Sequence, residues 1–290
     1  MSRPFSGRRL AATQTARGLG ERPNVPAAVG ATVWLVIVGV PLYFLVTTSF
    51  RTSSNYLLAG PLALPKSLSF ANYLAVLKSG FATYFGNTVI VTASTVAIVL
   101  GLSLPAAYAI VRSQSPLVRR FFSVVLGGLA IPAQATIIPI YLIISNLHLY
   151  DTLLAIILPT AAFSIPLAIL VLTSSLRDVP AELYESMSMD GATPSRAFFT
   201  LAVPLSRGAI TTVGIFTAMG AWNGFLFPLV LTQSASTRVL TLGLWTFQSQ
   251  YGEDVPSIAA AVLLSLLPLL VLYLIGRRQL LSGLTAGFGK

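Results

Sequence analysis

The stretch Asp178–Pro204 reads Asp-Val-Pro-Ala-Glu-Leu-Tyr-Glu-Ser-Met-Ser-Met-Asp-Gly-Ala-Thr-Pro-Ser-Arg-Ala-Phe-Phe-Thr-Leu-Ala-Val-Pro. It is a polar, charged island between two long apolar segments of the chain. Half of the chain's eight acidic residues lie inside it, namely Asp178, Glu182, Glu185 and Asp190. Because the whole chain is only 9% charged, this concentration predicts that the loop is a surface which another molecule recognises.

The composition around this loop is that of a membrane protein. Hydrophobic residues make up 55% of the chain, the mean hydropathy is +0.81, and soluble domains are about a quarter charged. Lipid must therefore solvate much of the apolar surface. The absence of Cys excludes disulfide scaffolds, thiolate metal sites and Cys nucleophiles. With His148 as the single histidine, we expect no metal site and no catalytic residue.

Six apolar runs are long enough to cross a membrane, because a hydrocarbon core of about 30 Å needs about 20 helical residues. They are 28–48, 88–111, 122–144, 153–174, 209–231 and 258–276. The sequence therefore predicts an all-α membrane protein with one six-span domain over 28–277. Residues 1–27, which are polar and basic, are predicted to be a disordered tail, and 278–290 a second tail.

The basic residues predict which side of the membrane each loop faces. An even number of spans places both tails on one side, together with the segments 112–121 and 175–208. Together with Arg277, just after the sixth run, these regions hold 14 of the 18 Lys and Arg residues. Since positive charge marks the cytoplasmic side, we expect loop 178–204 and both termini to be cytoplasmic, in a multi-pass protein of the cell membrane. The net charge of +10 follows from the same topology and does not indicate nucleic acid.

The predicted spans contain no Asp, Glu, Lys, Arg or His. Such residues inside a membrane usually carry ions or protons, so their absence argues against an ion-coupled carrier. Asn223, next to Trp222 in the fifth run, is the deeply placed amide that we single out. It either lines a polar translocation path or bonds across helices, and the sequence does not decide between the two.

The island itself reads as two short helices around a glycine. Pro180 suits a first helical turn, Ala181–Asp190 contains good helix formers, and Gly191 provides a left-handed stop. Thr193 and Pro194 then form an N-cap and a first helical position, and Pro204 is expected to end the second helix. A helix of about ten residues is marginal alone in water, so it either docks on a partner, lies along the membrane or folds back on its own bundle.

The spacing within the island resembles a known motif. The island resembles the EAA loop of ATP-binding-cassette importer permeases, whose pattern is Glu-Ala-Ala-x3-Gly-x9-Ile-x-Leu-Pro. Here Glu185-Ser186-Met187 is followed after three residues by Gly191, and after nine more by Leu201-Ala202-Val203-Pro204. Ser186 and Met187 replace the two alanines and make the face bulkier. Further segments resemble the carbohydrate branch of that family and its maltose-transporter-type subunit: Asn72-Tyr73, Tyr84-Phe85-x-Asn87, Ala106-Ala107-Tyr108-Ala109, Trp222-Asn223-x-Phe225 and Gly283-Leu284-Thr285-Ala286-Gly287.

The resemblance implies a fold, partners and roles. It implies the fold of type I importer permeases, a homologous second permease, two cytoplasmic ATPase subunits and an extracytoplasmic solute-binding protein that delivers a sugar. The helix with Glu185 would be the coupling helix that seats on an ATPase subunit. The coupling residues it implies are Glu182, Glu185, Ser186, Met187, Asp190, Gly191 and Pro204. The chain would bind no cofactor itself, and ATP and Mg²⁺ would be used by the partner ATPase, since the ending Gly283–Lys290 lacks the spacing of a phosphate-binding loop.

Two other classes of function are weaker alternatives. A passive channel or secondary carrier for a small polar solute does not explain the loop pattern. An intramembrane enzyme would need paired acids, His or Cys in the spans, and these are absent. The predicted outer segment 233–256, with Trp245 and Tyr251, either contacts the binding protein or is merely a solvated loop.

Overall fold

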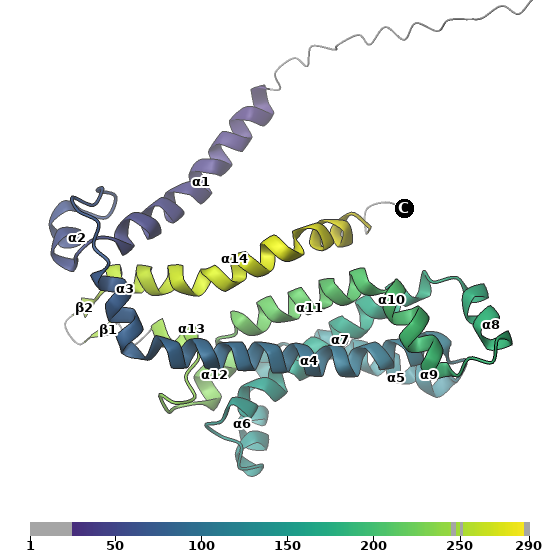
Figure 1. Ribbon diagram of the computed structural model, residues 1–290. Coiled ribbons are helices and arrows are strands. Elements are labelled where there is room, and N and C mark those ends of the chain that lie inside the picture. The colour runs from purple at the N-terminus through teal and green to yellow at the C-terminus, as the bar shows by residue number, and fades with distance from the viewer. Residues whose placement is uncertain (1–24, 245–247, 250–251, 287–290) are drawn as a thin grey trace, which may run out of the picture. The chain divides into compact units, whose positions relative to one another are not determined.

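The computed structural model describes residues 25–244, 248–249 and 252–286, and this part of the chain is helical apart from one small hairpin (Figure 1). The α-helices are α1 (Val25–Ser49), α2 (Ser53–Ala59), α3 (Ala71–Val76), α4 (Ala82–Arg112), α5 (Pro116–Gly127), α6 (Ile137–Asn146), α7 (Leu153–Arg177), α8 (Ala181–Met189), α9 (Pro194–Ala197), α10 (Val203–Leu205), α11 (Arg207–Trp222), α12 (Leu226–Leu231), α13 (Leu240–Gly243) and α14 (Val255–Ala286). Two π-helices (Leu77–Phe81, Phe198–Ala202) and two 3₁₀ turns (Gly128–Ala130, Ala133–Thr136) lie between them. Strands β1 (Gln248–Ser249) and β2 (Gly252–Glu253) pair antiparallel.

The chain divides into two units at Phe44. The first contributes the apolar helix from Val25 to Phe44, which contains Pro41. The contacts described below lie within the second unit, of which the structure describes residues from 45 to 286.

Among the described residues, three helices are long and apolar enough to cross a membrane. These are Val25–Ser49, the continuous helical stretch Ala71–Arg112, and Leu153–Arg177. The number rises to five if each of two bent helix pairs counts as one span, and Val255–Val271 is a shorter apolar helix. The chain therefore has an all-helical membrane fold, while the number of six spans stays a prediction.

Two of the predicted spans are not continuous helices. The run 122–144 is broken between α5 and α6, and the two arms meet at 95°. Pro132 restricts the residue before it to extended backbone, and Ile131 has φ −87° and ψ 113°. The run 209–231 is likewise interrupted by the non-helical residues between α11 and α12. Both runs lie in helical regions of the structure, but the apolar pattern did not predict the break in either of them.

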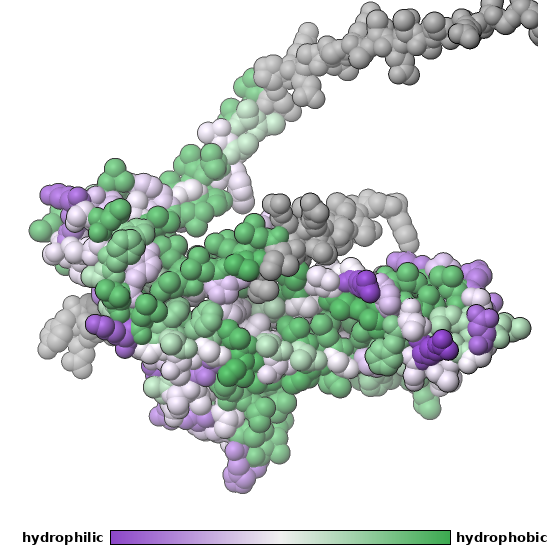
Figure 2. Space-filling model, viewed as in Figure 1, coloured by the Kyte–Doolittle hydropathy of each residue, from purple (hydrophilic) through white to green (hydrophobic). Residues whose placement is uncertain are grey.

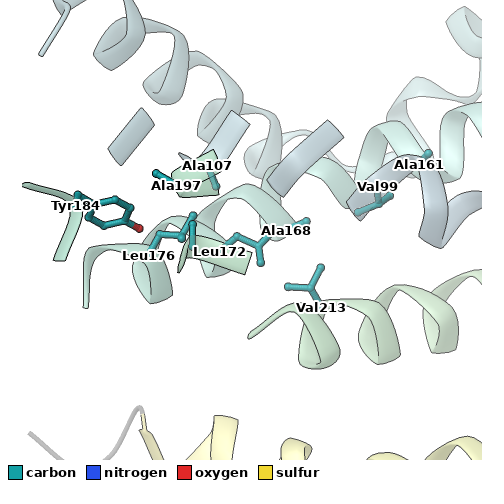
Figure 3. Close-up of a cluster of buried hydrophobic side chains, with 10 residues drawn as sticks. Val99, Ala107, Ala161, Ala168, Leu172, Leu176, Tyr184, Ala197 and Val213 are labelled. Carbon is teal, nitrogen blue, oxygen red and sulfur yellow. The ribbon is translucent and has the colours of Figure 1, made fainter. Parts of the chain in front are cut away.

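The core of the second unit lies where α4, α7 and α11 run side by side (Figure 1). Small side chains let α4 and α7 approach closely, as is usual for helices packed in lipid. Figure 3 shows the buried cluster that results, in which Val99 and Ala107 of α4 meet Ala161, Ala168 and Leu172 of α7. The same cluster continues into the loop after α7, because Tyr184 and Ala197 belong to it.

The segment after α1 is fixed by a buried cation. Arg51 is 1% exposed, and its guanidinium donates to Asn55 Oδ1 and to the carbonyl oxygens of Asn55 and Gly60, each over 2.8 Å. The Asn72 amide donates to the carbonyl oxygens of Ser49 and Arg51, also over 2.8 Å. Asn72 thus ties α3 to the end of α1.

Candidate functional site

The polar island forms two helical arms joined by a glycine turn. α8 is the first arm, and α9, the π-helix Phe198–Ala202 and α10 form the second. The sequence predicted this helix, turn and helix, with Pro180 one position earlier than expected, at the N-cap of α8. The second arm meets α11 at an angle of 74°.

A left-handed glycine closes α8. Gly191 has φ +76°, its N–H donates to the Ser188 carbonyl over 3.0 Å, and the Ala192 N–H donates to the Met187 carbonyl over 2.9 Å. This is the Schellman arrangement, which satisfies carbonyl groups left open at a helix end. A Cβ at position 191 would meet no atom within 4 Å, so the requirement for glycine is conformational.

The second arm begins as predicted and ends differently. The Thr193 hydroxyl accepts from the Arg196 N–H over 3.3 Å, and Pro194 is the first helical residue. Pro204, however, does not end the helix, because α10 continues through it to Leu205. The π-helix immediately before it widens the turn in which the proline ring must fit. The bend into α11 follows at Ser206, which is 1% exposed.

The outward face of α8 carries most of the predicted coupling residues. Glu182, Glu185 and Ser186 are exposed, and Met189 is 88% exposed. Asp190 is exposed at the C-cap. Figure 2 shows hydrophilic residues gathered over α8 and α9. The structure therefore brings two carboxylates and a large flexible apolar side chain together on one solvent-facing stripe.

The inward face of α8 holds the helix to the bundle. Tyr184 is 3% exposed, and the half-buried Met187 packs against the same core. Figure 3 shows Tyr184 near Leu176 and Ala197. Met187, predicted as a coupling residue, thus lies on the bundle side of the helix. Docking on a partner and folding back on the bundle are compatible, because they use opposite faces.

Tyr184 is a residue whose importance the sequence reasoning missed. The Arg112 guanidinium carbon lies 4.4 Å from the centroid of its ring, and the Tyr108 ring lies 6.2 Å away. Burial raises the pKa of the Tyr184 phenol and Tyr108 adds to the rise, while Arg112 opposes it. The ring is therefore neutral at physiological pH. Two features of the sequence could have indicated this contact. Tyr184 is an aromatic residue in the middle of a polar loop, and the motif with Tyr108 lies just before Arg112 at the end of a predicted span.

Asn223 caps its own helix. Its Nδ2 donates to the Met219 carbonyl over 2.9 Å, and the side chain is exposed. Within the described ranges, the Asn223 side chain makes no hydrogen bond to another helix, and a place in a translocation path stays a prediction. A groove of about 410 Å³ lies nearby between α7 and α11, lined mainly by apolar side chains that include Phe163 and Phe216.

A second polar cluster lies at the opposite end of α4. The Asp151 carboxylate accepts from the N–H groups of Gln233 (2.8 Å) and Ser234 (3.0 Å) and from the hydroxyls of Ser234 and Thr237. The Gln233 N–H and the Ser234 hydroxyl are the main causes that hold the pKa of Asp151 far below its ordinary value. The Asn87 amide donates to the carbonyls of Ser236 and Arg238, over 2.7 and 2.9 Å. The first part of the predicted outer segment is thereby fixed, whereas Trp245 and Tyr251 lie outside the described residues.

Within the part of the chain that the structure describes, no three His, Asp or Glu side chains gather into a metal-binding group. The exposed α8 stripe is the surface that suits a partner.

Comparison with known proteins gives a family and relatives. The family model of the binding-protein-dependent transport system inner membrane component matches residues 95–280. An ABC transporter permease protein of Caldicellulosiruptor sp. is 40% identical over 258 residues, which is 89% of this chain and 94% of that protein. The diacetylchitobiose uptake system permease protein NgcG of Streptomyces coelicolor is 33% identical over 88% of this chain and 85% of its own length.

Two solved structures share the fold. One is a bacterial ABC transporter involved in the import of the acidic polysaccharide alginate, with a TM-score of 0.76 at 19% identity, covering 88% of this chain and 95% of the matched chain. The other is a bacterial alginate ABC transporter in complex with a periplasmic protein bound to alginate pentasaccharide, with a TM-score of 0.61 at 15% identity, covering 88% and 94%.

Proposed function

The chain belongs to the family of inner membrane components of binding-protein-dependent transport systems and is a permease subunit of an ABC importer, and we propose that its loop 178–204 couples the membrane helices to a cytoplasmic ATPase. The observation that carries this proposal is the orientation of α8. Its Tyr184 face is buried in the bundle, and its Glu182, Glu185 and Met189 stripe is open to a partner.

The physical basis of the proposed coupling is that α8 has two different faces. One face packs on the bundle, and the other is free to bind a partner subunit. An isolated helix of nine residues is marginal in water, but α8 is held by its core contacts and by the glycine turn. A subunit that binds the exposed stripe therefore moves a structured element. Closure of an ATPase dimer would bias the bundle between two arrangements, as switching elements at interfaces do.

The proposed substrate is a sugar. The relatives and fold neighbours are named for diacetylchitobiose uptake and for alginate import, and the motifs at Asn72, Asn87 and Trp222 resemble the carbohydrate branch. The solute would cross a path formed half by this chain and half by a homologous second permease. ATP and Mg²⁺ would be used by two partner ATPase subunits, and a solute-binding protein would deliver the sugar from outside.

The proposed topology has six spans with both termini in the cytoplasm. The 14 Lys and Arg residues on the predicted cytoplasmic side support it. So does the division of polar loops in the structure, with the α8 loop beside Arg112 at one end of α4 and the Asp151 cluster linked to the other end through Asn87.

Reconstitution tests the function directly. The chain is assembled in proteoliposomes with the second permease, the ATPase and the binding protein encoded with it, and uptake of a labelled oligosaccharide held by that binding protein is measured. We expect uptake that requires ATP and the binding protein. Uptake by the purified chain without nucleotide would instead support a passive channel or secondary carrier.

A further inference from the structure

Both ends of α4 are fastened to polar loops. At its C-terminal end, Arg112 lies over the Tyr184 ring of α8. Tyr108, one turn earlier, contacts the second arm of the same loop, because its ring is 5.2 Å from that of Phe198 and its hydroxyl donates to the Pro194 carbonyl over 3.3 Å. One turn of α4 therefore holds both arms of the island.

The Tyr184 ring, and not its hydroxyl, makes this attachment. The side chain is 3% exposed, yet its hydroxyl has no hydrogen-bond partner among the residues that the structure describes. Burying an unpaired hydroxyl is costly, so packing of the ring and its contact with the Arg112 cation must offset that cost.

The other end of α4 is fastened by hydrogen bonds. Asn87 is 8% exposed, and its amide donates to the Ser236 and Arg238 carbonyls. The Thr88 hydroxyl accepts from the Leu240 N–H over 2.9 Å. The segment 232–240 is thus attached to α4 by two consecutive side chains, about 37 Å along the helix from Arg112 at 1.5 Å per residue.

The helix between these attachments is braced. α4 is a single α-helix from Ala82 to Arg112 although it contains Pro105. Its buried residues Val99, Ser103 and Ala107 face the tightly packed interior beside α7. Such close packing makes the interior resistant to gradual deformation.

We propose that Tyr184 and Asn87 are positioning residues that fasten the coupling loop and the segment 232–240 to the opposite ends of α4, so that the three elements move as one body. This inference rests on the proposed coupling function, because it concerns what the ATPase moves when it acts on α8. A displacement of α8 is then delivered directly to the outer face, where the binding protein is proposed to dock.

Pairs of spin labels test the proposal in the assembled transporter. The chain contains no Cys, so Met189→Cys with Leu102→Cys reports the α8 attachment, and Leu102→Cys with Ala235→Cys reports the segment 232–240. Met189 and Leu102 are 88% and 57% exposed, and Ala235 is exposed. Distances are compared between the nucleotide-free complex and the complex with ATP when hydrolysis is blocked by EDTA. We expect both distances to stay the same in the two states.

Substitutions separate the two attachments. Tyr184→Leu is expected to broaden the first distance, to leave the second unchanged, and to lower the solute transported per ATP several-fold. Asn87→Ala is expected to broaden only the second distance. Tyr184→Phe keeps the ring and removes only the unpaired hydroxyl, so it should behave as the unsubstituted chain in all three measurements. If Tyr184→Leu does not assemble, Arg112→Gln tests the same attachment by removing the cation.

Two results would overturn the proposal. One is a change of either distance between the two nucleotide states in the otherwise unsubstituted chain. The other is an unaltered first distance and an unaltered transport-to-ATP ratio in Tyr184→Leu, or in Arg112→Gln where it replaces that variant. If ATP-driven uptake is absent while both distances stay fixed, the coupling function fails and the fastening of α4 stands.

Discussion

The Ala192 N–H donates to the Met187 carbonyl over 2.9 Å, and this bond closes α8 across Gly191. The bond forms only if the intervening residue adopts the left-handed backbone conformation. Gly191 does so with φ +76°. The requirement for glycine at position 191 therefore comes from the backbone conformation at the end of α8, and not from a steric contact at that position.

Gly191→Ala tests this explanation. A residue with a Cβ pays about 1–2 kcal/mol in the left-handed region, while the space around position 191 is open. We expect reduced ATP-driven uptake in proteoliposomes, and a larger loss for Gly191→Val. Gly208→Ala is the matched control, because it adds the same methyl group in open space on the regular helix α11. Equal uptake by Gly191→Val and the unsubstituted chain would contradict the explanation.

The exposed carboxylates of α8 predict a charge-sensitive interface. Glu185 is exposed, so Glu185→Lys should leave the thermal stability of the isolated chain nearly unchanged. We expect its affinity for the ATPase subunit to fall by about tenfold or more, because unfavourable charge pairs at interfaces cost several kcal/mol. Lys66→Glu reverses an exposed charge on the predicted outer side and should not affect binding. A loss of equal size in both variants would show a general effect of net charge.

The Asp151 cluster predicts that the Gln233 and Ser234 amides are protected from hydrogen exchange, and that mild acid does not change this protection. The pKa of the Asp151 carboxyl is lowered from the ordinary value of 3.8. The hydrogen bonds to the ionised carboxylate therefore stabilise the fold fully above pH 3.8, and this stabilisation is lost only as the pH falls through the lower folded-state pKa. Hydrogen exchange at the Gln233 and Ser234 amides, corrected for intrinsic rates, should show constant protection from about pH 8 to pH 5. Asp151→Ala should abolish it, and Asp151→Asn should retain part. Protection that fades between pH 7 and pH 5 would refute the assignment.

Gly243 is required for a steric reason. A Cβ there would lie 2.5 Å from Tyr84 Cδ2, and Tyr84 is buried beside Trp222 and Leu240. Gly243→Ala is therefore expected to destabilise the chain by about 1–3 kcal/mol through overpacking, measured as a lower melting temperature in detergent. Gly86→Ala, which adds a methyl group to α4 in open space, should not lower it. Equal melting temperatures for the two variants would contradict this account.

The sequence predicted much of the coupling loop because its signals are local. Gly191, Thr193 and Pro194 act within a few residues of their own positions, and the structure has the predicted stop and N-cap there. The prediction that Pro204 ends the second helix was wrong. A π-helix, which no local pattern predicted, precedes Pro204, and the helix continues to Leu205. Apolar length predicted where long apolar helices lie, whereas the 95° break near Pro132 depends on how both arms pack.

The attachments that fix the loop were not predictable, because they are distant in sequence. The whole of α5, α6 and α7 lies between Arg112 and Tyr184 in the chain. The Asn87 amide donates to a carbonyl 149 residues away. The resemblance marked Tyr108 and Asn87 as family positions without giving a reason. The structure supplies it, since each joins α4 to a remote loop.

The most direct test of the account is the location and partner of α8, measured with Met189→Cys in a chain that has no other Cys. In intact cells, we predict that a membrane-impermeant maleimide does not label this position, and that it does so only after the membrane is opened. In the assembled complex, a thiol-to-amine crosslinker should join it to the ATPase subunit. Labelling from outside intact cells, or the absence of a crosslink to the ATPase in a complex that transports, would contradict the claim that this helix transmits the action of the ATPase.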